Sequence, residues 1–381
     1  MQTLRRFVCQ LCASSSVSTQ SIRQLSSVRE TAEHSLAEED EEAGNITKKK
    51  KRRNRLLQRS DESIFAPDGF PQFERMTKDE FAKHIADSQV YNHDGVIGLN
   101  KPAGIHVTGT SENQMNIVDV IPEVMEAVGK PAGEIAKAAD RESSGLILLG
   151  ETKEVTRKIN DAFINARKSN QMVRKYWTLT LGIPTPAEGT INIPIGPEQI
   201  GNQTLMVPKM NPTKGSFERK ETFRCKTDYK VLSANPHLNC SLLELQPLKL
   251  QKHQLQVHLT SKLCSILGDR TYSNRIQHIL GVRLLVDPHQ VTMGTQDIPD
   301  PIKTVLNLRT WHMSRLPLFL HWYQATLPKW TQTKDLIITA PPPPYFLDAL
   351  QRLDLCNQTV EDRCRYLLMD EPKENNFNPG L

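Results

Sequence analysis

The stretch that most constrains the fold is a short apolar segment that follows a charged loop. Residues 144–150, SGLILLG, are apolar and begin and end in small residues. Such a run is typical of a buried strand. The preceding residues, KAADRES, predict a surface loop that brings Asp140 to the edge of the core. A lone loop aspartate is usually only a solvated charge, so its role depends on the rest of the sequence.

Composition indicates a globular core with irregular flanks. The chain has 381 residues, 38% apolar content and 24 prolines, enough for one large domain or two ordinary ones. The net charge of +5 does not by itself imply nucleic acid. Seven scattered cysteines argue against a disulfide framework and favour a reducing compartment. No apolar run approaches the roughly 18 residues that a membrane span needs.

The flanks are predicted to lie outside the globular domain, which we place at residues 76–350. Residues 1–29 are rich in arginine and serine and lack acidic residues, which predicts a mitochondrial transit peptide and a location in the matrix. We predict that residues 30–75 form an unfolded linker, because an acidic block is followed by the basic block KKKKRRNR and like charges within each block repel one another. This basic block would also suit an RNA-contacting arm or a nuclear address. Residues 351–381 predict a polar tail.

The pattern of predicted elements favours an α+β fold. Strand pairs occur at hairpin spacing, and helices occur between them at irregular intervals, which predicts a mostly antiparallel, mixed sheet with flanking helices. Helices are predicted over residues 78–88, 115–128, 153–168 and 252–263. Strands are predicted over residues 95–100, 144–150, 174–182, 227–232, 241–245, 305–308 and 316–327, with a further hairpin formed by 189–195 and 204–207.

Five segments occur in the order and spacing of one enzyme family. They are GLNKPAGIHV, AADRESSGLILLG, RKYWTLTLGIPTPAEGTINIPI, TDYKVLS with LLELQPLKLQKHQLQVH, and ILGDRTY. Together they resemble the RluA class of pseudouridine synthases, and the arginine-rich start makes the chain most similar to mitochondrial members that act on mRNA. The resemblance implies the pseudouridine synthase catalytic fold, RNA as the partner, and chemistry without a metal or an organic cofactor.

The resemblance also implies roles for individual residues. Asp140 stands at the aspartate of the family's Arg-Leu-Asp motif and is expected to be catalytic. Tyr176 matches the tyrosine that packs on the uracil and handles its C5 proton. The other residues expected at the substrate are Arg141, Lys175, His253, Gln256 and Leu267. For His253 and its neighbour in the motif, His258, we expect structural hydrogen bonds rather than a metal.

Three arginines of the family pattern are absent from this chain. Gln251 and Gln256 replace two of them, and Ala138 replaces the third. In the family, the arginine at the position of Gln256 pairs with the catalytic aspartate. An unperturbed aspartate has a pKa of about 3.9, so we expect Asp140 to stay ionised without it. Gln256 is expected to donate a hydrogen bond to Asp140, and Arg141 is expected to supply the missing charge.

The sequence therefore leaves two functions of different classes open. The first is a pseudouridine synthase that acts on mitochondrial mRNA or rRNA. The second is an RNA-binding factor of ribosome assembly or mRNA translation that uses the same fold without catalysis. A third interpretation, a nuclear protein addressed by the basic block, predicts a nuclear signal that survives removal of residues 1–29.

Overall fold

The computed structural model describes most of the chain between residues 73 and 368. The described residues are 73, 76–109, 115–280, 282–291, 294–331 and 333–368, and all belong to the compact unit Glu62–Leu381. The predicted transit peptide and, apart from residue 73, the predicted linker lie outside them. Within the described part, none of the helices combines the length and the apolar character that crossing a bilayer requires.

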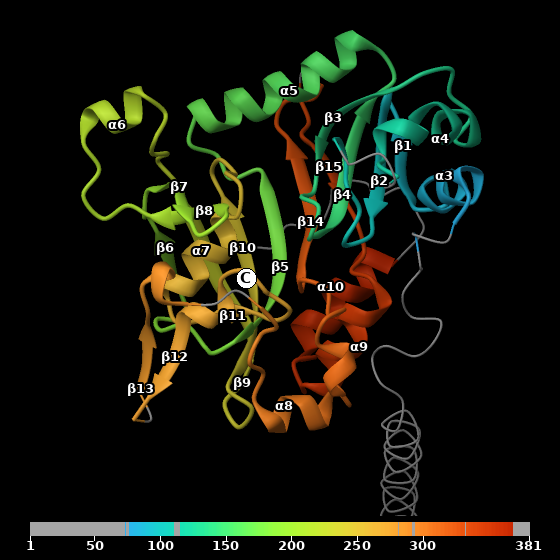
Figure 1. The fold of residues 1–381 in the computed structure, drawn as a ribbon. Coiled ribbons are helices and arrows are strands. Elements are labelled where there is room, and N and C mark those ends of the chain that lie inside the picture. The colour runs from blue at the N-terminus through green and yellow to red at the C-terminus, as the bar shows by residue number, and fades with distance from the viewer. Residues whose placement is uncertain are drawn as a thin grey trace, which may run out of the picture. The chain divides into compact units, whose positions relative to one another are not determined.

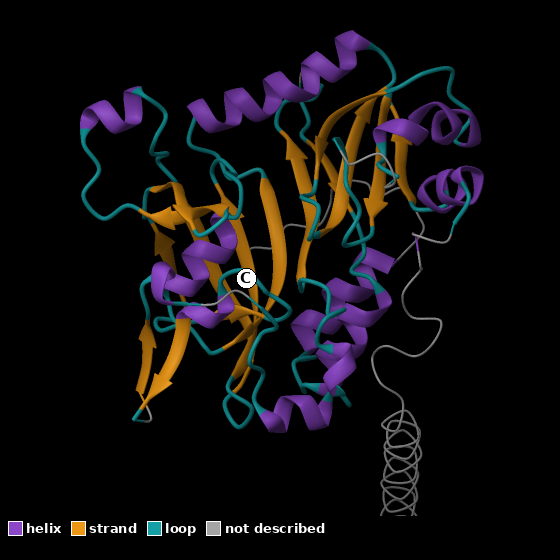
Figure 2. Ribbon diagram, viewed as in Figure 1, coloured by secondary structure: helices purple, strands orange, loops and turns teal. Residues whose placement is uncertain are grey.

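One large sheet organises the described residues (Figures 1 and 2). The strands are β1 Gln89–His93, β2 Val96–Lys101, β3 Glu134–Ala138, β4 Ser144–Gly150, β5 Arg174–Leu181, β6 Glu188–Ile191, β7 Ile195–Ile200, β8 Gln203–Pro208, β9 Thr227–Asn235, β10 Cys240–Pro247, β11 Ser265–Ile266, β12 Ile276–Ile279, β13 Val282–Leu285, β14 Leu320–Leu327 and β15 Leu336–Thr339. The main path runs β1-β2-β4-β14-β5-β10-β9-β6, while β3 pairs with β4, β11 with β5, and β15 with β14. Among the described strands, only β4 and β14 run parallel. The predicted mostly antiparallel, mixed sheet is confirmed.

Helices cover both faces of this sheet. They are α3 Lys78–Ala86, α4 Ile121–Ala127, α5 Lys153–Lys168, α6 Lys214–Glu218, α7 Gln254–Ser261, α8 Asp300–Val305, α9 Pro344–Arg352 and α10 Gln358–Leu368, with short 3-10 helices η2 Val118–Val120, η3 Ser273–Arg275, η4 Pro288–Gln290 and η5 Thr310–His312. α3 and α4 pack on one face of β2 and β4, and α5 packs along β3, β4 and β14 on the other (Figure 1). α8, α9 and α10 cover the face of β5 that carries Trp177.

The strand β4 is buried throughout because helices pack on each of its faces. Leu146 and Leu148 belong to the apolar cluster that contains Phe163 of α5. Ile147 and Leu149 belong to the cluster formed with α3 and α4. Successive side chains of a strand point to opposite faces, so a strand covered on both sides needs an uninterrupted apolar run. The predicted buried strand is therefore confirmed, with the predicted bounds.

Other predicted elements differ from the structure. The helix predicted over 115–128 begins only at residue 118, as η2 followed by α4. The predicted hairpin of 189–195 with 204–207 is wrong, since β6 pairs with β9 and β7 pairs with β8. The strand predicted over 305–308 is wrong as well, because α8 ends there and a turn follows it. The four residues VLNL are too few to distinguish a strand from the end of a buried helix.

The packed body extends beyond the predicted boundary at residue 350. α9 continues to Arg352, and α10 follows it. Val360 and Leu367 of α10 are buried in the same apolar cluster as Trp177 of β5. Residues 351–368 therefore belong to the core of this unit.

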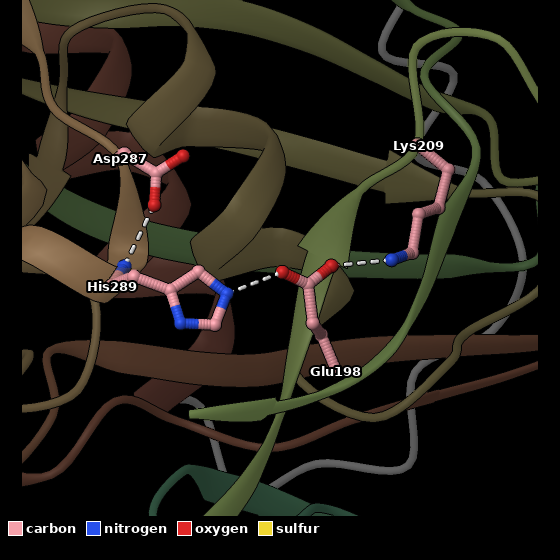
Figure 3. A network of polar contacts seen from close by, with 4 residues as sticks. All are labelled: Glu198, Lys209, Asp287 and His289. Carbon is pink, nitrogen blue, oxygen red and sulfur yellow. Dashed lines mark hydrogen bonds and ion pairs between the residues drawn. The ribbon is translucent and has the colours of Figure 1, made fainter. Parts of the chain in front are cut away.

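A charged network joins the β7–β8 hairpin to the segment after β13 (Figure 3). The His289 Nε2–H donates to Glu198 Oε1 at 2.8 Å, and the other oxygen of Glu198 pairs with Lys209. The backbone N–H of His289 donates to Asp287 Oδ1 at 2.8 Å. The side chain of His289 is 52% exposed, so its ion pair adds about 1 kcal/mol at most.

Candidate active site

The centre of the sheet brings Asp140 close to Tyr176. Gly145 of β4 pairs with Trp322 of β14, and Trp322 pairs in turn with Tyr176 of β5. Asp140 lies on the loop between β3 and β4, a few residues before Gly145. Burial raises the pKa of Tyr176, and the negative charge of Asp140 raises it further. Strand pairing therefore joins the loop of Asp140 to the strand of Tyr176 through β14.

Gly145 allows the parallel strands β4 and β14 to approach at this point. Its φ angle is +119°, a conformation that residues with a side chain rarely adopt. A Cβ atom at this position would lie 2.4 Å from the backbone oxygen of Trp322. Glycine therefore permits the contact that places the Asp140 loop beside the strand of Tyr176.

The carboxylate of Asp140 is exposed at the surface but has protein around it on most sides. The resulting loss of hydration raises its pKa, and Glu142 raises it further, whereas Lys101, Arg174 and Lys252 lower it. Within the described residues, no hydrogen bond or ion pair engages this carboxylate. It is therefore available to an incoming group.

Lys101 holds the backbone on which Asp140 is presented. Its side chain is fully buried, and its Nζ donates to the carbonyl oxygens of Pro102 at 2.9 Å, Ile105 at 3.3 Å and Arg141 at 3.2 Å. Burial lowers the pKa of Lys101 to about 7, although Asp140 acts to raise it. We did not predict this role from the sequence. The signal was present, because a lysine that ends a buried strand needs partners for its charge.

Tyr176 belongs to an aromatic group that also holds a cation. Its ring stacks on Trp322, with centroids 5.9 Å apart and planes inclined by 18°. The Arg174 guanidinium lies over the ring of Phe163 at 4.2 Å and over that of Trp322 at 5.7 Å. The hydroxyl of Tyr176 is buried without a hydrogen-bond partner in the described residues. Buried hydroxyls are normally paired, so this hydroxyl is an exception among the described residues.

Gln256 contacts a different carboxylate from the one we expected. Its Nε2 lies 3.5 Å from Asp269 Oδ1, and it makes no hydrogen bond to Asp140. Every residue of α7 from Gln254 to Thr260 is buried, and this packing directs Gln256 toward the turn after β11. Arg141 also differs from expectation, since it is exposed and its charge acts on Lys101 rather than on Asp140.

The two histidines of the same motif make structural contacts. His253 Nδ1 lies 2.9 Å from the hydroxyl of Tyr272. His258 contacts Thr227 Oγ1 at 2.9 Å and the carbonyl oxygen of Ile193 at 3.0 Å. The expected structural hydrogen bonding of His258 is confirmed. In the described ranges, no group of three or more His, Cys, Asp or Glu side chains is placed to hold a metal ion.

Lys175 and Leu267 lie on the opposite face of the sheet from Tyr176. Lys175 lines a cavity beneath α10, and Leu267 is buried in the cluster of Trp177. Ile266, rather than Leu267, shares the cluster of Tyr176. The reason is the two-residue repeat of a strand, which turns adjacent residues to opposite faces. The same repeat puts Arg174 on the face of Tyr176.

The chain is an RNA pseudouridine synthase, because residues 95–261 match the RNA pseudouridylate synthase family and a member that is 32% identical covers 76% of this chain. The chain therefore belongs to this family of isomerases, as its five segments predicted.

Comparison with individual members shows which proteins of this family the chain is similar to. The mitochondrial mRNA pseudouridine synthase Rpusd3 of Mus musculus is 32% identical over 295 residues, covering 76% of this chain and 84% of that protein. The mitochondrial pseudouridylate synthase RPUSD4 of Bos taurus is 31% identical over 300 residues, which are 74% of each protein. Among solved structures, human RNA pseudouridylate synthase domain containing 4 has a TM-score of 0.56 and 26% identity, covering 74% of this chain and 98% of that chain.

Proposed function

We propose that this protein converts uridine to pseudouridine in mitochondrial RNA and that Asp140 is the reacting carboxylate. The observation that carries the proposal is the position of Asp140, exposed and unpaired among the described residues, on the loop that leads into β4 and is joined through β14 to the strand of Tyr176. An exposed carboxylate that no protein donor engages in the described residues is free to meet a substrate, which suits a reacting group.

The chemistry requires this carboxylate to be ionised. In pseudouridine formation the bond between N1 and C1′ breaks, the uracil turns, and a bond forms between C5 and C1′. The proton on C5 is then lost and N1 is left protonated, so that the reaction is an isomerisation. Asp140 serves either by attacking C1′ or by removing a proton from C2′. In both routes the ionised carboxylate is the reactive form. The cations Lys101, Arg174 and Lys252 favour this form because they lower the pKa of Asp140.

The target uridine must leave its base stack to reach Asp140, as target bases do in other enzymes that modify bases. The exposed side chain of Asp140 supports this access. Tyr176 is buried in the strand that β14 joins to the Asp140 loop, where its ring stacks on Trp322. Lysine and arginine side chains nearby, such as Lys137 and Lys252, would bind phosphates and set register without reading sequence.

The mitochondrial location and the RNA class rest on the relatives and on the first residues of the chain. The Rpusd3 relatives of mouse and human, 32% and 31% identical, are mitochondrial mRNA pseudouridine synthases by name. Residues 1–29 have the composition of a transit peptide. We therefore place the activity in the mitochondrial matrix, with mRNA as the first substrate to test and rRNA as the second.

The test is the Asp140→Asn variant, which keeps the shape of the side chain and removes its charge. Pseudouridine is mapped across mitochondrial transcripts in cells that lack the protein and are complemented with the wild-type chain or with D140N. We expect D140N to restore no site, since loss of such a group costs about 10²–10⁴-fold in rate or more. Asp161→Asn, a matched change on the exposed face of α5, should restore all of them.

A second function, RNA binding without catalysis, is favoured by one observation. Gln256 contacts Asp269 and brings no cation to Asp140. If the protein acted only by binding RNA, D140N would restore the phenotype of cells that lack the protein as well as the wild-type chain does. In addition, no transcript would lose pseudouridine when the protein is absent.

A further inference from the structure

One tryptophan of this chain lies largely on the surface. Trp311 is 58% exposed, whereas Trp177, Trp322 and Trp330, which complete the set of four, are at most 6% exposed. Trp311 belongs to residues 309–315, a segment between α8 and β14 that contains η5 and that we call the Trp311 turn. Tryptophan is enriched at binding surfaces, because its ring offers a large, rigid contact area together with a polar N–H group. The exposed indole therefore marks a candidate binding surface.

Positive charge flanks this indole. Arg309 and Arg315 lie in the same turn, and both are exposed. None of the described carboxylates pairs with either guanidinium. Residues 301–334 contain five lysines and arginines and no acidic residue. Phosphates suit such guanidiniums, because they match them in geometry as well as in charge.

A third arginine fixes the Trp311 turn to the motif ILGDRTY. Arg270 Nη1 donates to the carbonyl oxygen of Ser314 at 2.7 Å, and Arg270 is itself exposed. Gly268 of the same motif lies so close to the carbonyl oxygen of Pro317 that no Cβ atom would fit between them. The turn is therefore held against the segment that carries Asp269, and Arg270 adds its charge to the same surface.

A histidine supports the indole from within the turn. The rings of Trp311 and His312 have centroids 3.7 Å apart and planes inclined by 51°. His312 is buried, and its Nδ1 accepts from the backbone N–H of Arg309 at 2.9 Å. Because a fixed neighbour holds the indole at the surface, little side-chain freedom is lost when a flat ring stacks on it.

We propose that the Trp311 turn binds single-stranded RNA: a nucleobase stacks on the indole, and Arg270, Arg309 and Arg315 bind the phosphates beside it. RNA fits this turn better than an acidic protein segment does, because RNA supplies flat rings as well as negative charges. Both kinds of contact accept any base, so the surface adds affinity and register rather than sequence specificity. The inference rests on the proposed function, which makes RNA the substrate, and assigns a surface to a part of that RNA other than the target uridine.

The first experiment uses the fluorescence of Trp311 and does not require activity. Acrylamide quenches exposed indoles, and the difference between the wild-type chain and Trp311→Phe gives the contribution of Trp311. The probe is a single-stranded oligouridylate of about 12 nucleotides, within the range of one single-strand site. We expect the probe to quench the emission of Trp311 and to protect it from acrylamide, and W311F to show neither effect. Emission and protection that do not change at saturating probe overturn the inference.

The second experiment measures the affinity of the same probe by fluorescence anisotropy. Trp311→Ala should bind about fivefold more weakly or worse, whereas W311F, which keeps a ring, should stay close to the wild type. Arg309→Met and Arg315→Met should each lower the slope of log Kd against log salt by about 0.7, the value for one phosphate contact with a single strand. The control is Met210→Ala, which removes a 78% exposed apolar side chain outside this turn and should leave the affinity unchanged.

Equal affinities of W311A and the wild-type chain, with both proteins folded by their thermal unfolding midpoints, would contradict the inference. A changed oligomeric state in W311A at unchanged RNA affinity would also contradict it, because the turn would then be a contact between copies of the chain. If no transcript depends on this protein for its pseudouridine, the proposed function fails, and the two binding measurements still decide the role of Trp311.

Discussion

At the scale of single residues, Asp269 is the buried carboxylate that this chain leaves without a cation. Its Oδ1 accepts from the backbone N–H groups of Thr271 at 2.9 Å and Tyr272 at 3.0 Å, and from Gln256 at 3.5 Å. Its Oδ2 is buried without a partner in the described residues. Burial raises the pKa of Asp269 to about 6. Among the described residues, the side chain that donates to Asp269 is the neutral Gln256, so no cation offsets the cost of burying this carboxylate.

Asp269→Asn should change how stability depends on pH. A raised pKa means that the folded state binds this proton more tightly than the unfolded state. The wild-type protein therefore loses stability as pH rises from about 4 through about 6, by up to about 3 kcal/mol. D269N cannot titrate and keeps an acceptor for both backbone N–H groups. Urea unfolding measured at about pH 4.5 and about pH 7.5 should show that the free energy of unfolding of D269N, relative to that of the wild type, is higher at pH 7.5 than at pH 4.5. The same difference at both pH values would contradict this.

At the scale of elements, the contact between β4 and β14 joins the Asp140 loop to the strand of Tyr176. Its narrowest point is at Gly145, where a Cβ atom would meet Trp322 at 2.4 Å. Because Trp322 also stacks on Tyr176, a displacement there would reach the site. This parallel contact thus links the Asp140 loop to the packing around Tyr176.

Gly145→Ala should lower the free energy of unfolding by about 2–4 kcal/mol, since it adds overpacking to a strained positive φ angle. The fold-decrease in kcat should also exceed the fold-change in KM, because Trp322 and Tyr176 would shift. The control is Gly129→Ala, where φ is also positive at +75° but no atom lies within 4 Å of the added Cβ. Equal losses of stability in the two variants would mean that backbone strain, and not the close approach of the strands, is responsible.

At the scale of the whole unit, α10 completes the core on the face of the sheet opposite Tyr176. Arg363 of α10 donates to Glu244 Oε2 of β10 at 2.8 Å, and the Tyr323 hydroxyl donates to the same oxygen at 2.6 Å. Glu244 has a side chain only 7% exposed. Although burial acts to raise the pKa of Glu244, its hydrogen bond from Tyr323 and the nearby cations lower it. The last described helix is thus attached through a buried charge.

Arg363→Met should destabilise the protein by about 2–4 kcal/mol near neutral pH, because it leaves a buried carboxylate without its cation. A lowered carboxyl pKa contributes stability above the unfolded-state pKa that is lost as pH falls through the folded-state value. The difference between R363M and the wild type should therefore shrink in acid. Arg365→Met, on the same helix but 63% exposed, is the control and should have little effect. A loss of unfolding free energy in R363M that is the same at all pH values would argue against a role for the charge of Arg363 in stabilising the fold.

The sequence by itself determined the family, the central strand β4, the helix α5 and the position of Asp140. These follow from motif order and from apolar runs, which depend only on residues close together in the chain. The partners of the site residues were decided by the tertiary structure. Gln256 contacts Asp269 because α7 is buried on all sides, and Arg141 is exposed while Arg174 packs over Phe163 and Trp322.

Strand geometry explains which of these partners could have been predicted. The two-residue repeat of β5 already separates Lys175 from Tyr176 and joins Arg174 to it. The rings that hold Arg174 come from α5 and β14, far apart in the sequence. Only long-range packing brings such groups together, because the charge around a carboxylate depends on distances in space that the spacing of residues along the chain does not encode.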